Sequence, residues 1–310
     1  MSNILIIKHG SLGDLIQSIG AIEDIKNSNI DSKVYLLTSF QYADLMSHCP
    51  FIDAILIDKR KPRWNIPYLL NLKKNLLRFN FSHVFDLQNS SRTIFYKKFI
   101  LNKPIWSSTY TALKDGQKKS DFDKDPVLDR LQVQLNRSGV DTKNIKKINL
   151  SWSFINISRL LKQYTSNDYI LIFPFCSKKH QNKRWPYFKE LINKLKQIYK
   201  LNYSIIIAPG PNEIAESKKF SAKVILDNEK ALNLNQLISL INGAKYIVSN
   251  DTGPAHICSH LNKNGLALFG SHTSSKKVNI GNSNFKVLSE KKLSNLDINT
   301  VISKIEKELN

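Results

Sequence analysis

The chain has 310 residues, of which 42% are hydrophobic, so it is long enough for two domains and is not a disordered chain. No apolar run approaches the ~20 residues of a membrane-spanning helix, and the N-terminus is charged too soon for a signal peptide, which predicts a cytoplasmic protein. Forty-six basic against 25 acidic residues give a net charge of +21. This surplus favours a polyanionic partner (nucleic acid, an anionic membrane surface or a phosphorylated glycolipid), although a Lys- and Asn-rich composition can also reflect genomic base bias.

In the first half of the chain, short β-branched runs alternate with amphipathic stretches, which is typical of an α/β protein with mainly parallel strands. The patterns predict strands at Asn3–Lys8, Lys33–Thr38, Ala54–Asp58 and His83–Leu87. Helices are predicted between them, for example at Asp14–Asn27 and Pro67–Phe79. A polar stretch, roughly Thr109–Lys147, follows with helix signals around Val127–Arg137.

The strand pattern restarts at Tyr169, which predicts a second domain of the same class. Its further strands are predicted at Ser204–Ala208, Lys223–Leu226, Tyr246–Ser249 and Leu266–Phe269, and a closing helix at Asp297–Leu309. Two successive doubly wound domains are the simplest account, each with its ligand contacts at the carboxyl ends of its strands. We expect domains at residues 1–160 and 161–295, followed by a terminal helix at 296–310.

The first candidate motif is a glycine turn, Lys8-His-Gly-Ser-Leu-Gly-Asp14, between the first strand and the first helix. Its spacing matches neither GxGxxG nor a phosphate-binding Walker loop, which counts against a nicotinamide dehydrogenase. Asp14 has two interpretations: an ordinary carboxylate capping the helix, or a general base that takes a proton from an acceptor hydroxyl. Spacing alone favours the first.

The second motif, Asn250-Asp-Thr-Gly-Pro-Ala-His256, follows a strand directly and opens a helix. Asp251 or Thr252 suits the cap and Pro254 the first helical position. The amides of residues 252–256 are then expected to face a phosphate. A purely structural turn explains the Gly and Pro but not the clustered Asp, Thr and His.

Three further loops carry charge. Four basic residues of the segment 173–186 suit a diphosphate clamp, although each taken singly also suits a solvated surface: Lys178, Lys179, Lys183 and Arg184. The loop Lys59-Arg-Lys-Pro-Arg-Trp64 and the helix start Asp86-Leu-Gln-Asn-Ser-Ser-Arg92 suit an anionic acceptor.

Taken together, the Gly-Asp pair that opens the first helix, Lys183-Arg-Trp-Pro and Asp251-Thr-Gly-Pro-Ala-His256 resemble glycosyltransferase family 9 in order and approximate spacing. The ADP-heptose:lipopolysaccharide heptosyltransferases are its best-known members. The resemblance implies a GT-B fold, with an N-terminal acceptor domain, a C-terminal donor domain facing it across a cleft, and a terminal helix that crosses back towards the first. It also implies inversion at the sugar carbon, without a metal or other cofactor.

Residue roles follow from the same resemblance. Asp14 matches the base and Lys183 the phosphate-binding lysine, and the two are expected to be catalytic. Donor binding is expected of Ser177, Lys183, Glu213, Asp251, Thr252, Gly253, Pro254, Ala255 and His256. The family's basic acceptor loop corresponds to the region of Arg60 and Arg63. Acceptor binding is also expected of Gly13, Gln88 and Arg92. Lipopolysaccharide biosynthesis is the expected process, with ADP-heptose as donor and an anionic glycolipid as acceptor.

Alternatives stay open. Heptosyltransferases commonly read Gly-Pro-Thr-Asp-Pro where this chain reads Gly270-Ser-His-Thr-Ser, so a different nucleotide-sugar donor is one alternative. A sugar-nucleotide-binding protein without catalysis is another, although Asp14 and Lys183 are both retained. Nucleic acid is not expected as a partner, because no helix-turn-helix or RNA-binding signature is present. Three scattered cysteines give no zinc framework. A membrane-embedded acceptor raises the hypothesis that a basic face of the first domain contacts the cytoplasmic side of the inner membrane.

Overall fold

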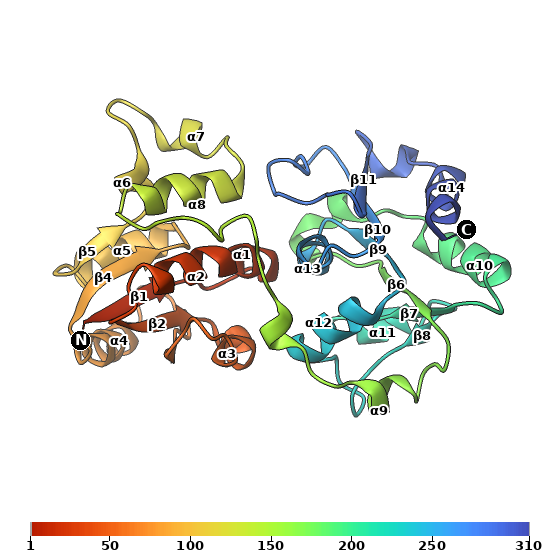
Figure 1. Cartoon of the computed structure of the whole chain (residues 1–310), viewed down its shortest axis with the longest axis horizontal. Coiled ribbons are helices and arrows are strands. Elements are labelled where there is room, and N and C mark those ends of the chain that lie inside the picture. The colour runs from red at the N-terminus through yellow and green to blue at the C-terminus, as the bar shows by residue number, and fades with distance from the viewer. Residues whose placement is uncertain (1, 310) are drawn as a thin grey trace. The chain divides into compact units, whose positions relative to one another are not determined.

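The computed structural model describes residues 2–309 and divides between Trp152 and Ser153 into two compact α/β units (Figure 1). The division falls before the predicted residue 161 because the segment after Trp152 is bonded to the second unit. Asn235 Nδ2 donates to the carbonyl of Ser153 at 2.9 Å, and the amide of Ile155 donates to Ser239 Oγ at 2.8 Å.

The first unit is built on a five-stranded parallel sheet with the order β3-β2-β1-β4-β5. Its strands are β1 (Asn3–Ile7), β2 (Lys33–Thr38), β3 (Ala54–Ile57), β4 (Phe81–Asp86) and β5 (Ile105–Ser107). Its helices are α1 (Leu12–Gln17), α2 (Ile19–Asn27), α3 (Phe40–Ser47), α4 (Ile66–Leu77), α5 (Ser91–Phe99), α6 (Thr109–Ala112), α7 (Lys119–Phe122) and α8 (Val127–Asn136).

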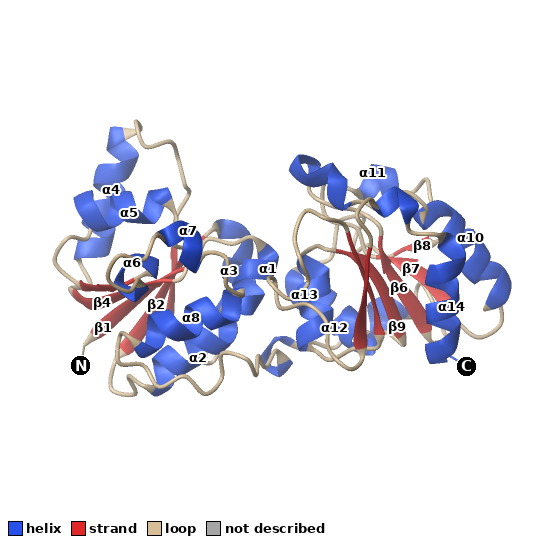
Figure 2. Ribbon diagram, turned by 90° about the horizontal axis from the view of Figure 1, so that it is seen from above, coloured by secondary structure: helices blue, strands red, loops and turns tan. Residues whose placement is uncertain are grey.

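Helices cover both faces of this sheet, as in a doubly wound domain. Figure 2 shows α4 and α5 on one face and α2 and α8 on the other. The predicted helix Asp14–Asn27 is two helices, because it is interrupted at Ser18, whose hydroxyl donates to the carbonyl of Leu15 at 2.7 Å.

The second unit has a six-stranded parallel sheet with the order β11-β10-β9-β6-β7-β8. Its strands are β6 (Tyr169–Phe173), β7 (Ser204–Ile207), β8 (Lys223–Val224), β9 (Tyr246–Asn250), β10 (Gly265–Phe269) and β11 (Phe285–Ser289). Its helices are α9 (Ser158–Leu161), η2 (Lys178–Lys183), α10 (Phe188–Ile198), α11 (Ile214–Ser217), α12 (Leu234–Gly243), α13 (Gly253–His260), η3 (Leu293–Asn295) and α14 (Ile298–Leu309), with η1 (Ser151–Ser153) at the division.

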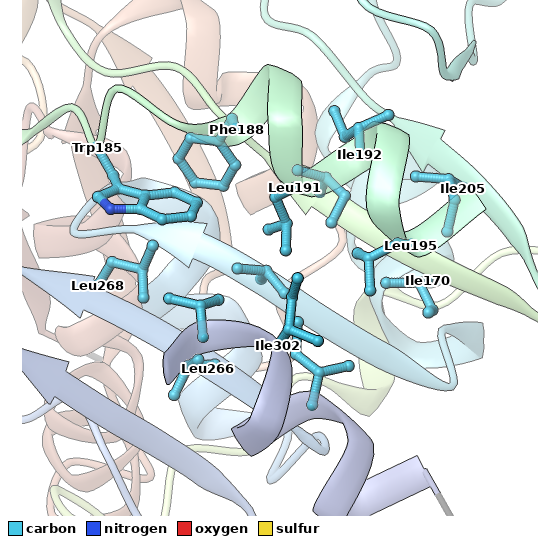
Figure 3. Close-up of a cluster of buried hydrophobic side chains, with 14 of the residues drawn as sticks. Ile170, Trp185, Phe188, Leu191, Ile192, Leu195, Ile205, Leu266, Leu268 and Ile302 are labelled. Carbon is cyan, nitrogen blue, oxygen red and sulfur yellow. The ribbon is translucent and has the colours of Figure 1, made fainter. Parts of the chain in front are cut away.

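The largest side chain of the second core is Trp185, which is fully buried between the sheet and α10 (Figure 3). Its indole donates to the carbonyl of Leu296 at 2.9 Å, so it also fixes the approach to α14. The terminal helix predicted from the apolar spacing forms, and its Val301, Ile302 and Ile305 pack in this same core. The predicted terminal helix is therefore a part of the second unit.

We predict that Trp185→Ala lowers the free energy of unfolding of the second unit by about 3–5 kcal/mol, because it leaves a cavity and removes the hydrogen-bond donor to the Leu296 carbonyl. Urea denaturation followed by circular dichroism measures the change. Trp64→Ala is the matched control, since Trp64 is 82% exposed and its loss is expected to change stability by less than about 0.5 kcal/mol. Equal effects of the two substitutions would contradict this prediction.

Candidate active site

Asp14 lies in the first turn of α1 at the carboxyl end of β1. The backbone N–H and the hydroxyl of Ser11 donate to its Oδ2 at 3.1 and 3.0 Å. Ser11 is therefore the N-cap and Asp14 the third helical residue of a capping box, so the capping role suggested by the sequence is real but is shared with Ser11.

A cavity of about 130 Å³ adjoins Asp14 in the first unit, and the predicted acceptor residue Gln88 lines it too. Lys8, also in its wall, donates to the carbonyl of Leu87 at 2.9 Å. Burial lowers the pKa of Lys8, against the opposing charges of Asp14 and Asp86. The cavity therefore combines a carboxylate, an amide and a buried amine, which are groups that bind hydroxyls.

Gly10 shapes the turn that leads to Asp14. Its φ is +108°, and a Cβ placed there would meet the ring of Tyr42 at 2.2 Å. Only glycine fits this turn without displacing Tyr42. Gly13, predicted as an acceptor contact, is buried in α1.

The basic loop after β3 is held by the buried carboxylate of Asp58. His9 Nε2 lies 2.8 Å and the Tyr96 hydroxyl 2.7 Å from its Oδ2, while the Tyr68 hydroxyl and the Arg60 amide donate to its Oδ1. Burial by itself would raise the pKa of Asp58, but the hydrogen bonds from His9, Tyr68 and Tyr96 outweigh it and hold the pKa well below its usual range. This network links the turn before Asp14 to the loop that carries Arg60.

Arg92 braces the same loop from α5. Its guanidinium donates to the carbonyls of Lys61 and Arg60 at 2.8 and 3.3 Å, and to the Tyr96 hydroxyl at 2.9 Å. Arg63 lies over the ring of Phe95. The structure thus gives Arg92 a positioning role, and it leaves the side chains of Arg60 and Arg63 exposed on this loop.

In the second unit, Asp251 joins two cationic or potentially cationic side chains. Lys183 Nζ and His272 Nε2 each lie 2.7 Å from its Oδ2, and Asp251 is only 3% exposed. Burial by itself would raise the pKa of Asp251, but the hydrogen bonds from Lys183 and His272 lower it overall. The His272 ring stacks on Phe269 at the end of β10.

The four basic residues predicted to form a diphosphate clamp have different surroundings in the structure. Of the four, only Lys183 reaches Asp251, whereas Arg184 pairs with Glu216 at 2.6 Å. Lys178 and Lys179 are exposed on η2. A run of basic residues does not reveal which side chains are paired, because their partners Asp251 and Glu216 lie in other segments of the chain.

At the start of α13, not every amide of residues 252–256 is available to face a phosphate. Thr252 is the N-cap, Pro254 has no N–H, and the Ala255 amide donates to the Thr252 carbonyl at 3.0 Å. The amides of Thr252 and Gly253 are therefore the ones best placed to meet an anion. The side chain of His256 is buried one turn into the helix.

Ser177 and Glu213, both predicted to bind donor, lie in loops after β6 and β7. Ser177 Oγ accepts from the Lys179 amide at 3.3 Å, and Glu213 Oε2 accepts from the Gly210 amide at 2.8 Å. Burial raises the pKa of Glu213. Because all strands of the sheet are parallel, these loops share one edge with Lys183 and Asp251. His272 lies at this edge as well. The sequence signal for it was that the residues after Gly270 differ from the common heptosyltransferase pattern.

Comparison with known proteins decides the family. The model of glycosyltransferase family 9 (heptosyltransferase) matches residues 69–305. The chain belongs to this family. The curated lipopolysaccharide heptosyltransferase 1 of Campylobacter coli is 24% identical, over 94% of this chain and 91% of that protein.

Solved structures of family members show the same fold. The E. coli heptosyltransferase WaaC with ADP-2-deoxy-2-fluoro heptose superposes with a TM-score of 0.71 at 18% identity, covering 98% of this chain and 99% of that one. The family 9 glycosyltransferase of Veillonella parvula gives 0.78 at 18% identity, covering 99% and 97%. The predicted GT-B fold and glycosyltransferase class are confirmed.

Two features are absent from residues 2–309, the part of the chain that the structure describes. No helix in this part of the chain is both long and apolar enough to cross a bilayer. Within the same residues, no three or more His, Cys, Asp or Glu side chains are grouped so as to hold a metal ion.

We predict that Asp58→Asn destabilises the first unit by about 2 kcal/mol or more, because buried donors lose a charged acceptor. The folded-state pKa of Asp58 lies below the unfolded value of about 3.9, so its contribution is complete above that pH and is lost as the pH falls through the folded-state pKa. Urea denaturation between pH 3 and pH 6 is thus expected to show a weaker acid dependence in Asp58→Asn than in wild type. Asp31→Asn, at an exposed position, is the control.

We also predict that His272→Ala lowers the free energy of unfolding of the second unit by about 1.5–3 kcal/mol, because it removes a donor from a buried carboxylate. Chemical denaturation measures the effect against His48→Ala, which alters an exposed histidine. If the two variants were equally stable, the hydrogen bond between His272 and Asp251 would contribute nothing measurable.

Proposed function

We propose that this family 9 glycosyltransferase transfers a heptosyl group from ADP-heptose to an anionic lipopolysaccharide core acceptor, by a single inverting displacement that needs no metal. The observation that carries the proposal is the pairing of Lys183 with buried Asp251 at the carboxyl edge of the second sheet. Curated and structural relatives are named as heptosyltransferases, and the WaaC structures hold ADP or an ADP-heptose analogue.

The donor half of the proposal uses the second unit. Lys183 is 25% exposed, so its ammonium is accessible to a ligand while Asp251 orients it. The amides of Thr252 and Gly253 add hydrogen-bond donors at the positive end of α13. An ammonium and two amides directed at a diphosphate stabilise the negative charge that develops when a nucleoside diphosphate leaves. Glu213 is proposed to bind the nucleoside.

The acceptor half uses the first unit. As the acceptor hydroxyl oxygen bonds to the anomeric carbon, its proton passes to Asp14. The bond from that carbon to the donor phosphate oxygen breaks, and its electron pair leaves with the nucleoside diphosphate. The attack comes from the face opposite the leaving group, so the configuration at the carbon inverts. Arg60 and Arg63 are proposed to bind acceptor phosphate or carboxylate groups, and Gln88 a hydroxyl.

The place of the reaction follows from the acceptor. A lipopolysaccharide precursor is a membrane lipid, so we propose that the enzyme works at the cytoplasmic face of the inner membrane as a peripheral protein.

A family 9 transferase that uses another nucleotide-sugar is the second candidate. His272 favours it, because this imidazole lies at the donor edge in a loop whose sequence differs from the common heptosyltransferase pattern. The choice between the two is a choice of donor, and it leaves the roles of Asp14 and Lys183 unchanged.

We predict that ADP, among ADP, UDP, GDP and CMP, raises the melting temperature of the wild type, because a ligand at ~100 times its Kd adds about 2.7 kcal/mol of stability. Lys183→Ala is expected to lose this shift. Asp14→Asn is expected to keep it while heptosyl transfer falls by about 10²–10⁴-fold. Thermal shift and a radiolabelled-donor transfer assay measure the two properties separately.

Lys178→Ala and Asp44→Asn, both at exposed positions, are the matched controls and are expected to behave as wild type. A shift with UDP or GDP in place of ADP would assign another donor. Full transfer by Asp14→Asn would remove Asp14 from the mechanism, and the absence of any nucleotide shift would contradict the proposed function as a whole.

A further inference from the structure

The loop before α4, α4 itself and α5 form a surface with an unusual charge distribution. Residues 59–80 contain seven basic and no acidic side chains, and residues 87–104 contain four basic and no acidic ones. Elsewhere in this unit Lys26, Lys119 and Lys146 are paired with aspartates. Over residues 2–309, no ion pair involves any of these eleven basic side chains. Arg92 and Lys73 donate to backbone carbonyls, but no carboxylate neutralises the charge of this surface, so it is available to an external anion.

Large apolar side chains are exposed among these charges. Trp64 is 82% exposed just before α4, and Ile66, Leu70 and Leu77 on the helix are 56%, 62% and 42% exposed. At 100° per residue, the three aliphatic side chains lie within about 40° of one another on α4. They form a stripe separate from the core-facing side of the helix.

The core-facing side of α4 is already satisfied. Leu69, Leu72 and Leu76 are buried against the sheet and α5. The exposed stripe is therefore not needed for folding of this unit, and Lys74 flanks it at the helix surface. An apolar stripe bordered by lysines is the pattern of a helix that lies in a membrane interface.

α5 extends this surface beside α4 (Figure 2). Lys73 Nζ donates to the carbonyl of Phe99 at 3.1 Å, which joins the second half of α4 to the carboxyl end of α5. Phe99 is 53% exposed, and Lys98 lies over its ring at 5.5 Å. On α5, as on α4, an exposed apolar side chain thus lies beside a lysine.

We infer that this α4–α5 surface docks on an anionic lipid bilayer, with Trp64, Ile66 and Leu70 entering the interface and the lysines meeting lipid phosphates. The charge selects an anionic partner, and the aliphatic stripe favours a bilayer over a nucleic acid, which offers it no apolar phase. Trp64 suits the boundary between headgroups and acyl chains. This inference names the surface that would serve the membrane contact of the proposed function, and in that respect rests on it.

Co-sedimentation with vesicles tests the inference without donor or acceptor, so its failure is distinguishable from failure of the transferase proposal. The purified full chain is expected to bind vesicles of phosphatidylglycerol and phosphatidylcholine at low salt, and pure phosphatidylcholine vesicles at least about tenfold more weakly. Leu70→Glu and the double variant Lys74→Glu/Lys98→Glu are each expected to lower partitioning by about tenfold or more.

Matched controls alter the same residue types elsewhere. Ile30→Glu replaces an aliphatic residue that is 79% exposed, and Lys304→Glu/Lys307→Glu makes the same change in net charge on α14. Both are expected to bind vesicles as wild type, and all four variants are expected to keep their nucleotide shift. Equal losses for the two charge-reversal variants would show that net charge alone drives binding, and this would overturn the inference. Unchanged binding by Leu70→Glu would overturn it as well.

Discussion

The loops of this protein depend on one constraint, which is that a carboxylate removed from water must be met by hydrogen-bond donors. Asp58, Asp86 and Asp251 each stand at the carboxyl end of a parallel strand and are 1–3% exposed. Two of them draw in donors from segments distant in the sequence: His9 and Tyr96 to Asp58, Lys183 and His272 to Asp251. Asp86 instead accepts from the nearby amides of Gln88 and Asn89. The edges where ligands bind in doubly wound folds are thereby held by charge-assisted bonds.

The same constraint separates side chains that build the site from side chains that are free to bind. Arg92 is a side chain that builds the site, because its guanidinium donates to loop carbonyls that include that of Lys61. Arg60 is fixed through its backbone and keeps its side chain exposed. The backbone of this basic loop is already ordered before an anion binds. Binding would therefore cost little further conformational entropy.

Most of the fold could be predicted from the sequence, since strands such as Lys33–Thr38 and Tyr169–Phe173 are buried β-branched or aromatic runs between turns. Two strands could not. β5 has only three residues, and in β11 only the first residue is buried, so neither carries a clear strand pattern. Both form because they pair with the neighbouring strands β4 and β10. Motif reasoning predicted that Asp251 and Lys183 act together, and the two meet in the structure. It missed the Asp58 network and His272, because partners such as Tyr96 and Asp58, 38 residues apart, and His272 and Asp251, 21 residues apart, meet only after folding.

His272 has a further consequence for donor binding. Lys183 and His272 share one oxygen of Asp251, so an ammonium that turns to a diphosphate would otherwise leave a buried carboxylate short of donors. Such a loss costs about 1–3 kcal/mol and would be subtracted from donor affinity. In the proposed donor complex, His272 would still donate to Asp251 while Lys183 turned to the diphosphate. A histidine in this loop is thus compatible with the proposed diphosphate-binding role of Lys183. Any preference that His272 confers on the choice of donor would then act through contacts with the sugar or through the orientation of Lys183.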